Sequence, residues 1–127
     1  MNYKTTYEDL PDGSKVLNAV VTKTTLGIED HGCLSSFIYV DRQGGCSQGF
    51  GGWALHLPPS FTHHELKSVA GHFICRVLDV CGVESWDKVA GKAVRICEKG
   101  GRLVAIGHII KDDWFIPQSD FEQAIKE

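Results

Sequence analysis

The segment 44–53, with the sequence GGCSQGFGGW, limits how this chain can fold more than any other. Five of its ten residues are glycine, and two are the aromatic residues Phe50 and Trp53. Glycine inside a strand costs backbone entropy and offers no side chain to pack. Two interpretations follow. The segment is one wall of a ligand site, or it is a kinked strand in a curved sheet whose aromatic residues belong to the core.

Length and composition favour a folded protein with one core. A chain of 127 residues with 43% hydrophobic residues is long and apolar enough to bury a core. We predict a flexible N-terminal arm over residues 1–14 and a single globular domain over 15–127. The net charge of −3 argues against a nonspecific nucleic-acid binder, which needs a basic surface. Since we find neither an apolar run of about 20 residues nor a signal-peptide core, we expect a cytoplasmic protein without membrane contact.

The five cysteines are odd in number, and no two have CxxC spacing. In a chain without an export signal, this pattern predicts reduced thiols. It also lacks the ligand spacing of a zinc site. We therefore expect no bound metal and no cofactor.

Hydrophobic periodicity predicts five strands and two helices. The strands are expected over 15–26, over 33–41, from the glycine-rich segment to Leu57, over 93–98 and over 102–110. A capping box at 62–65 and apolar helical spacing up to Cys81 predict one long helix that ends at Gly82. A second capping box at 119–122 predicts a short C-terminal helix. Trp114 to Ile116 form an apolar stretch between the last predicted strand and this helix. The predicted fold class is α+β, with a five-stranded antiparallel sheet or a small OB-like barrel in the order β-β-β-α-β-β.

The polar candidates for a site lie on two loops. Asp30 and His31 form one pair, and His108 precedes Asp112 and Asp113. A histidine beside a carboxylate can act as a general base, a metal ligand or a ligand-binding donor, or it can bond its own turn. We find no nucleophile elbow, HExxH or Walker A sequence, so we assign no catalytic residue.

The cationic candidates are Arg42, which precedes the glycine-rich segment, and Arg95 and Arg102, on the two strands that flank the 99–101 hairpin. Arg95 and Arg102 would be neighbours across this hairpin and would either face solvent or meet an anion beside exposed glycine amides. We expect the site where the glycine-rich strand meets the Asp30–His31 loop and the end of the fifth strand. The predicted ligand-binding residues are Asp30, His31, Gly49, Phe50, Gly51, Gly52, Trp53, Arg95, Arg102 and His108.

Three segments, EDHG at 29–32, GFGG at 49–52 and GHIIKDDWF at 107–115, resemble those of a family of short uncharacterised proteins of tailed phages and prophages. The resemblance covers roughly residues 15 to 116 and carries no known activity. It implies a phage context, in which small accessory proteins often counteract host defence in the host cytoplasm.

These observations favour a non-enzymatic phage accessory protein. Its partner would be a small anionic, nucleotide-type ligand or a host defence protein, and the sequence is compatible with a homo-oligomer. The alternatives are an OB-like single-stranded nucleic-acid binder that stacks bases on its aromatic residues, and a small His/Asp-based hydrolase.

Overall fold

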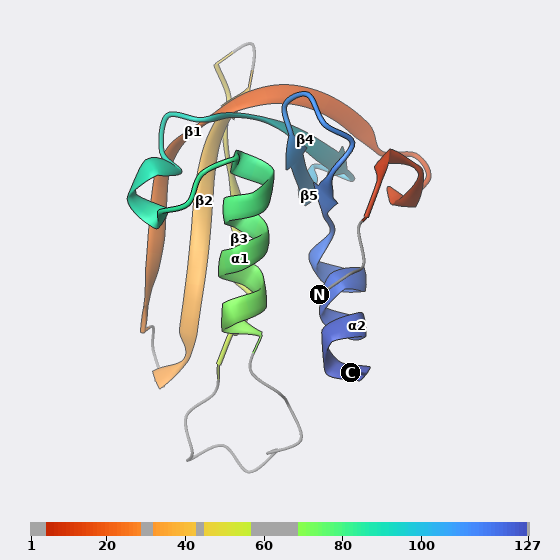
Figure 1. The fold of residues 1–127 in the computed structure, drawn as a ribbon. Helices are drawn as coiled ribbons and strands as arrows, with labels where there is room; N and C mark the ends of the chain where they lie inside the picture. The colour runs from red at the N-terminus through yellow and green to blue at the C-terminus, as the bar shows by residue number, and fades with distance from the viewer. Residues whose placement is uncertain (1–4, 29–31, 43–44, 57–68, 127) are drawn as a thin grey trace.

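The structure, a computed structural model, describes residues 5–28, 32–42, 45–56 and 69–126. Its centre is one antiparallel sheet in the spatial order β3-β2-β1-β4-β5-β6 (Figure 1). The strands are β1 (Lys15–Ile28), β2 (Leu34–Arg42), β3 (Ser47–Gly51), β4 (Ala93–Lys99), β5 (Arg102–His108) and β6 (Trp114–Phe115). The α+β class and the antiparallel sheet are confirmed. The sheet has six strands rather than the five predicted, because Trp114 and Phe115 pair with β5.

β1 is the strand about which the sheet bends. Its first half pairs with β4, and its second half pairs with β2. The register against β2 shifts between Val21 and Lys23, so Thr22 is the extra residue of a bulge. A bulge bends a strand and increases its twist. β1 therefore arches over the molecule and turns the β2–β3 half of the sheet towards the β4–β5 half (Figure 1).

The curved sheet does not close into a barrel within the described residues. Cα atoms of β3 and β5 come within 8 Å of each other, but the two strands share no ladder. β6 pairs only with Ile106 and Gly107 of β5, so the residues from Arg102 to Ala105 have no described strand on that side. The described strands therefore curve towards a barrel without closing one, and an open seam separates β3 from β5.

The concave face of the sheet is filled by α1 (Ala70–Cys81). Phe73 and Val77 of this helix are fully buried against Ile38, Val94 and other apolar residues of the sheet. Gly82 ends the helix in the left-handed conformation, with φ of 71°, as its sequence position predicts. The first part of the predicted helix, at 62–68, lies outside the described residues.

The second helix, α2 (Pro117–Lys126), lies beside α1 and follows β6 directly (Figure 1). The predicted capping box at 119–122 is wrong, because the helix begins two residues earlier at Pro117. Proline suits the first helical position, where its missing N–H is not needed. The hydroxyl of Ser119 instead donates to the carbonyl of Ile116 from inside the first turn.

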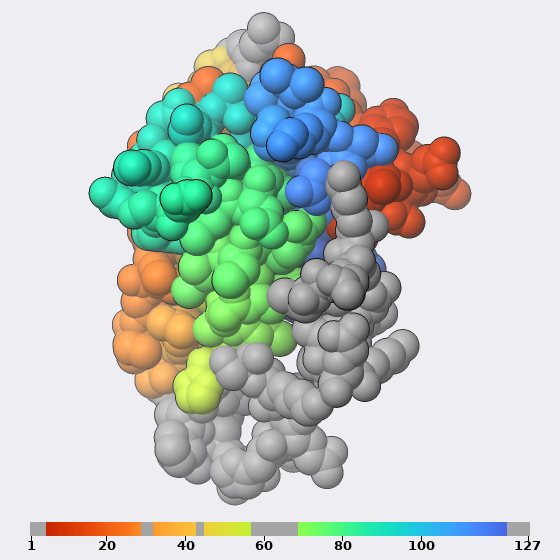
Figure 2. Space-filling model, in the orientation of Figure 1, coloured from red at the N-terminus to blue at the C-terminus, as the bar shows by residue number. Residues whose placement is uncertain are grey.

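Residues 5–14 do not form the predicted flexible arm. The backbone N–H of Trp114 donates to the carbonyl of Thr5, and the N–H of Tyr7 donates to Asp112 Oδ1 at 2.6 Å. Leu10 packs against the second, smaller core cluster, on the face of the sheet opposite α1, which contains Trp114 and Cys97. Figure 2 shows these N-terminal residues in red against the blue part of the sheet. The strand-like pairing and the burial of Leu10 attach the segment to the sheet.

A buried arginine joins α1 to the C-terminal part of the chain. The guanidinium of Arg76 donates to Asp113 Oδ1 at 2.9 Å, to the carbonyl of Trp114 at 2.8 Å and to Asp79 at 3.1 Å. Burial lowers the pKa of Arg76, but the hydrogen bond and charge of Asp113 together with the charge of Asp120 raise it above its ordinary value. Arg76 therefore stays charged and holds β6 against α1.

Asp120 of α2 also lies against the Arg76 guanidinium. One of its carboxylate oxygens lies 3.5 Å from Arg76 Nε and 3.9 Å from His72 Nε2. The side chain is 1% exposed. Burial raises the pKa of this carboxyl to about 6, although the charge of Arg76 acts in the opposite direction. The residue thus links α2 to α1 at an electrostatic cost.

Candidate functional site

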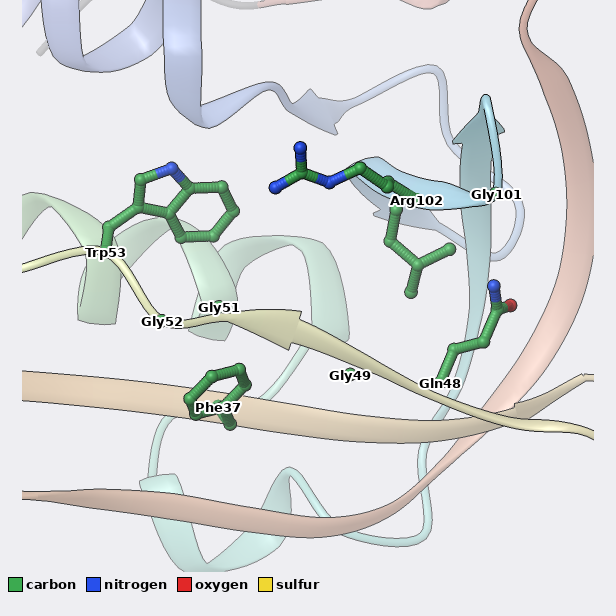
Figure 3. A pocket seen from close by; sticks show the side chains of 9 residues that line it. Phe37, Gln48, Gly49, Gly51, Gly52, Trp53, Gly101 and Arg102 are labelled. Carbon is green, nitrogen blue, oxygen red and sulfur yellow. The ribbon is translucent and has the colours of Figure 1, made fainter.

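The seam between β3 and β5 holds a cavity of about 580 Å³. Figure 3 shows it between β3 on one side and the start of β5 on the other, with the side chain of Arg102 extending towards Trp53. A second cavity of about 490 Å³ continues from it towards α2. We call the two together the seam groove. Its lining residues include Phe37, Gln48, Gly49, Gly52, Trp53, Lys99, Arg102, Gln118 and Phe121.

Backbone groups of β3 point into the seam groove. The Gly52 N–H donates to the carbonyl of Ser36, and the Arg42 N–H donates to the carbonyl of Cys46. In an antiparallel ladder hydrogen-bonded and non-hydrogen-bonded pairs alternate. The backbone groups of Gly49 and Gly51 therefore point away from β2, towards the free edge of the sheet. No backbone partner occupies that edge in the described chain, so these amides are available to a ligand.

The glycines themselves are explained by packing rather than by ligand approach. Gly51 has a φ of 141°, and a Cβ there would lie 2.1 Å from the carbonyl oxygen of Ser36. A Cβ at Gly52 would lie 2.7 Å from the ring of Phe37. Both positions need glycine because β2 lies against them. Packing against β2 thus accounts for both glycines, and both also line the first cavity.

The two aromatic residues of the segment have different roles. Phe50 is 1% exposed, and its ring packs against Trp53 at 5.2 Å and Phe73 at 6.4 Å between centroids. Its predicted role as a ligand-facing ring is wrong, because alternation along β3 turns Phe50 into the core. Trp53 is half-buried and lines both cavities. It is the aromatic face that the segment offers to the groove.

The two arginines predicted as neighbours lie apart. Arg102 pairs across the hairpin with Lys99, whereas Arg95 pairs with Gly107 near the other end of β5. Arg95 donates to the carbonyls of His108 and Lys111, and its guanidinium lies 4.9 Å from the Trp114 ring centroid. Arg95 is therefore a structural residue. Arg102 is exposed at the junction of the two cavities.

His108 does not lie at the seam groove. It is six residues from Arg102 along β5, which is about 20 Å in an extended strand. Its Nδ1 accepts hydrogen bonds from the backbone N–H groups of Ile110 and Lys111, both at 3.0 Å, so it stabilises a turn. The predicted convergence with the glycine-rich strand is wrong at this residue. Asp30 and His31 lie outside the described residues.

Several residues of the groove were not predicted from the sequence. Lys99 and Gln48 reach the groove because the hairpin and β3 meet across the seam, and Gln118 and Phe121 reach it from α2. The one sequence signal for this part of the groove was the glycine pair of the hairpin, which predicts a turn between the charged residues Lys99 and Arg102. The pairing of Arg42 with Glu98 at 2.6 Å was also unexpected and removes Arg42 as a cation for a ligand.

Comparisons with known proteins give no family for the chain. No family model matches it, and no curated protein has significant similarity. The resemblance to short phage proteins therefore stays a prediction. Within the described ranges, no three acidic, histidine or cysteine side chains are placed to hold a metal ion. Nor is any helix in those ranges long and apolar enough to span a membrane.

Proposed function

We propose that the protein binds a small anionic ligand with a planar ring, of the nucleotide type, in the seam groove and does so without catalysis. The observation that carries this proposal is the meeting of three kinds of group at one cavity. Trp53 offers an aromatic face, Arg102 a charged donor, and the free edge of β3 backbone amides. Ligand pockets commonly combine an apolar wall with a few directed polar groups.

The width of the seam favours a small molecule over an inserted peptide strand. Adjacent strands lie about 4.8 Å apart, so a strand between β3 and β5 needs about 9.6 Å. Cα atoms of these two strands come within 8 Å of each other. A small molecule would instead use the cavity of about 580 Å³ already present at the seam, which requires no separation of the strands.

Thermal melting and calorimetry with inorganic phosphate, mononucleotides and dinucleotides test the proposal. A ligand at a hundredfold excess over its Kd adds about 2.7 kcal/mol, or roughly 10 °C in Tm for a domain of this size. Arg102→Gln should weaken binding by about 10- to 100-fold, the effect of one hydrogen bond to a charged group. Lys88→Gln removes an exposed charge outside the groove and should have no effect.

Failure of every compound to shift the Tm, or equal affinity of the Arg102→Gln variant for a ligand that does bind, would refute the proposed site. Melting of each variant without ligand shows whether the substitution has changed the stability. Trp53 is left unchanged in this test because its ring also contacts Phe50 and Phe73 in the core.

One observation favours the alternative of a single-stranded nucleic-acid binder. Phe37 and Tyr39 form a stacked, half-exposed pair with centroids 5.7 Å apart, and Lys23 Nζ lies 5.7 Å from the Tyr39 ring centroid. Bases stack on such pairs. Fluorescence anisotropy with a labelled oligonucleotide tests this, and Tyr39→Ala should then reduce binding whereas Arg102→Gln should not abolish it.

We propose a biological role on the sequence resemblance alone. A phage-encoded accessory protein that sequesters a nucleotide-type signal, or binds a host defence protein, would counteract host antiviral defence in the host cytoplasm. Expression in a bacterial host that carries a nucleotide-signalling defence system tests this. Restored plaque formation supports the role, and it should be lost with Arg102→Gln.

A further inference from the structure

The second cavity of the seam groove extends the site beyond what a mononucleotide needs. It shares Trp53, Arg102 and Leu103 with the first cavity, so the two are continuous. Its far wall is formed by Gln118 and Phe121 of α2. Each cavity alone is within the range of 300–1,000 Å³ typical of pockets for drug-sized ligands. A mononucleotide in one cavity would leave the other without an occupant.

Two cations lie beside the groove: Arg102 lines both cavities, and Lys99 lines the second cavity next to it. Lys99 and Arg102 are directly opposite each other across the β4–β5 hairpin, and both are exposed. Like charges in this position destabilise a hairpin unless an anion lies between them. No acidic side chain of the described residues forms an ion pair with either one, and the nearby Glu98 is paired with Arg42. The junction is therefore suited to a phosphate.

Aromatic rings lie on both sides of this junction. Phe37 lines the first cavity, Phe121 lines the second, and Trp53 lines both. The rings of Trp53 and Phe121 meet edge to face, with centroids 6.2 Å apart. Each cavity thus has an aromatic wall against which a planar base can pack.

We propose that the ligand is a dinucleotide, with one base in each cavity and a phosphate between Lys99 and Arg102. This inference rests on the proposed function and deepens it by naming the class of ligand. The arrangement of ring, cation pair and ring along one groove matches two nucleosides joined through phosphate. The free amides of β3 would hydrogen-bond the part of the ligand in the first cavity.

Calorimetric titration with AMP and with the linear dinucleotide pApA tests the inference. The wild-type protein should bind pApA at least about tenfold more tightly than AMP. Gln118→Trp fills the second cavity from an exposed helical position and should lower the affinity for pApA by about tenfold or more, towards that for AMP. Lys99→Gln should weaken pApA about tenfold or more. The control Lys88→Gln should change neither affinity.

The outcomes separate this inference from the proposed function. If AMP and pApA bind equally well, or if Gln118→Trp leaves pApA affinity unchanged, the dinucleotide inference is overturned and the proposed function stands. If neither AMP nor pApA binds, the dinucleotide inference is overturned, and the proposed function is overturned as well only if the other nucleotides and phosphate also fail to shift the Tm. Circular dichroism and melting of each variant show that a loss of binding does not come from unfolding.

Discussion

Replacement of Asp120 by asparagine should change the free energy of unfolding more favourably at pH 8 than at pH 4. The carboxyl of Asp120 is buried beside Arg76, and burial raises its pKa from 3.8 to about 6. Its folded-state pKa is thus above its unfolded value, so its contribution to stability is full below about pH 4 and is lost as the pH rises through 6. This difference in pKa corresponds to about 2–3 kcal/mol. Asparagine has no such dependence, because it is neutral throughout.

Urea unfolding followed by tryptophan fluorescence between pH 4 and pH 8 measures the effect. The free energy of unfolding of Asp120→Asn, minus that of the wild-type protein, should rise by about 2–3 kcal/mol over this range. A fall with pH would show that the attraction of Arg76 outweighs burial and would refute the reasoning. The imidazole of His72 lies 3.9 Å from the carboxylate, so the series is repeated in a His72→Gln background. Persistence of the rise there assigns it to Asp120.

Three further predictions concern packing and thiol chemistry. Gly51→Ala should destabilise the protein by about 2 kcal/mol or more in urea unfolding, because φ is positive there and the added Cβ would meet the backbone of β2. The control Gly71→Ala, where an added Cβ meets nothing within 4 Å, should be neutral or stabilising by up to about 1 kcal/mol. Phe73→Ala should lower stability by about 3–5 kcal/mol, since the ring is fully buried, and an unchanged Tm would show that it is not a core residue. In the native protein Cys46 and Cys75 should react rapidly with a thiol reagent, and five thiols should react after denaturation; a lower count would indicate disulfides.

The fold was predictable where the signal is local. The apolar spacing around Phe73 and Val77 and the terminal Gly82 define α1, and the β-branched run of β1 defines a strand. The sixth strand was not predictable, because two residues, Trp114 and Phe115, show no alternation. Their pairing depends on β5 and on the N-terminal segment rather than on their own sequence.

The candidate site was predictable only in part, for the same reason. The glycine-rich segment marked β3, and Trp53 and Arg102 do line the groove. The approach of β3 to β5 depends on the bulge at Thr22, which brings together residues that no local pattern connects. His108 was wrongly predicted to lie at the groove. It ends β5, so the length of this strand separates it from the 99–101 hairpin. A histidine in a turn gives the same sequence signal whether it binds a ligand or caps the turn.

The pairing of Thr5 with Trp114 has a consequence for the order of folding. These residues are 109 positions apart, and the side chain of Thr5 also donates to the Trp114 carbonyl. Contacts of such long sequence separation form late, because the loop-closure entropy must be lost first. During synthesis Thr5 therefore has no sheet partner until β6 has left the ribosome. The β1–β2 hairpin can form earlier, so the segment around Thr5 is among the last parts of the described structure to pack onto the sheet.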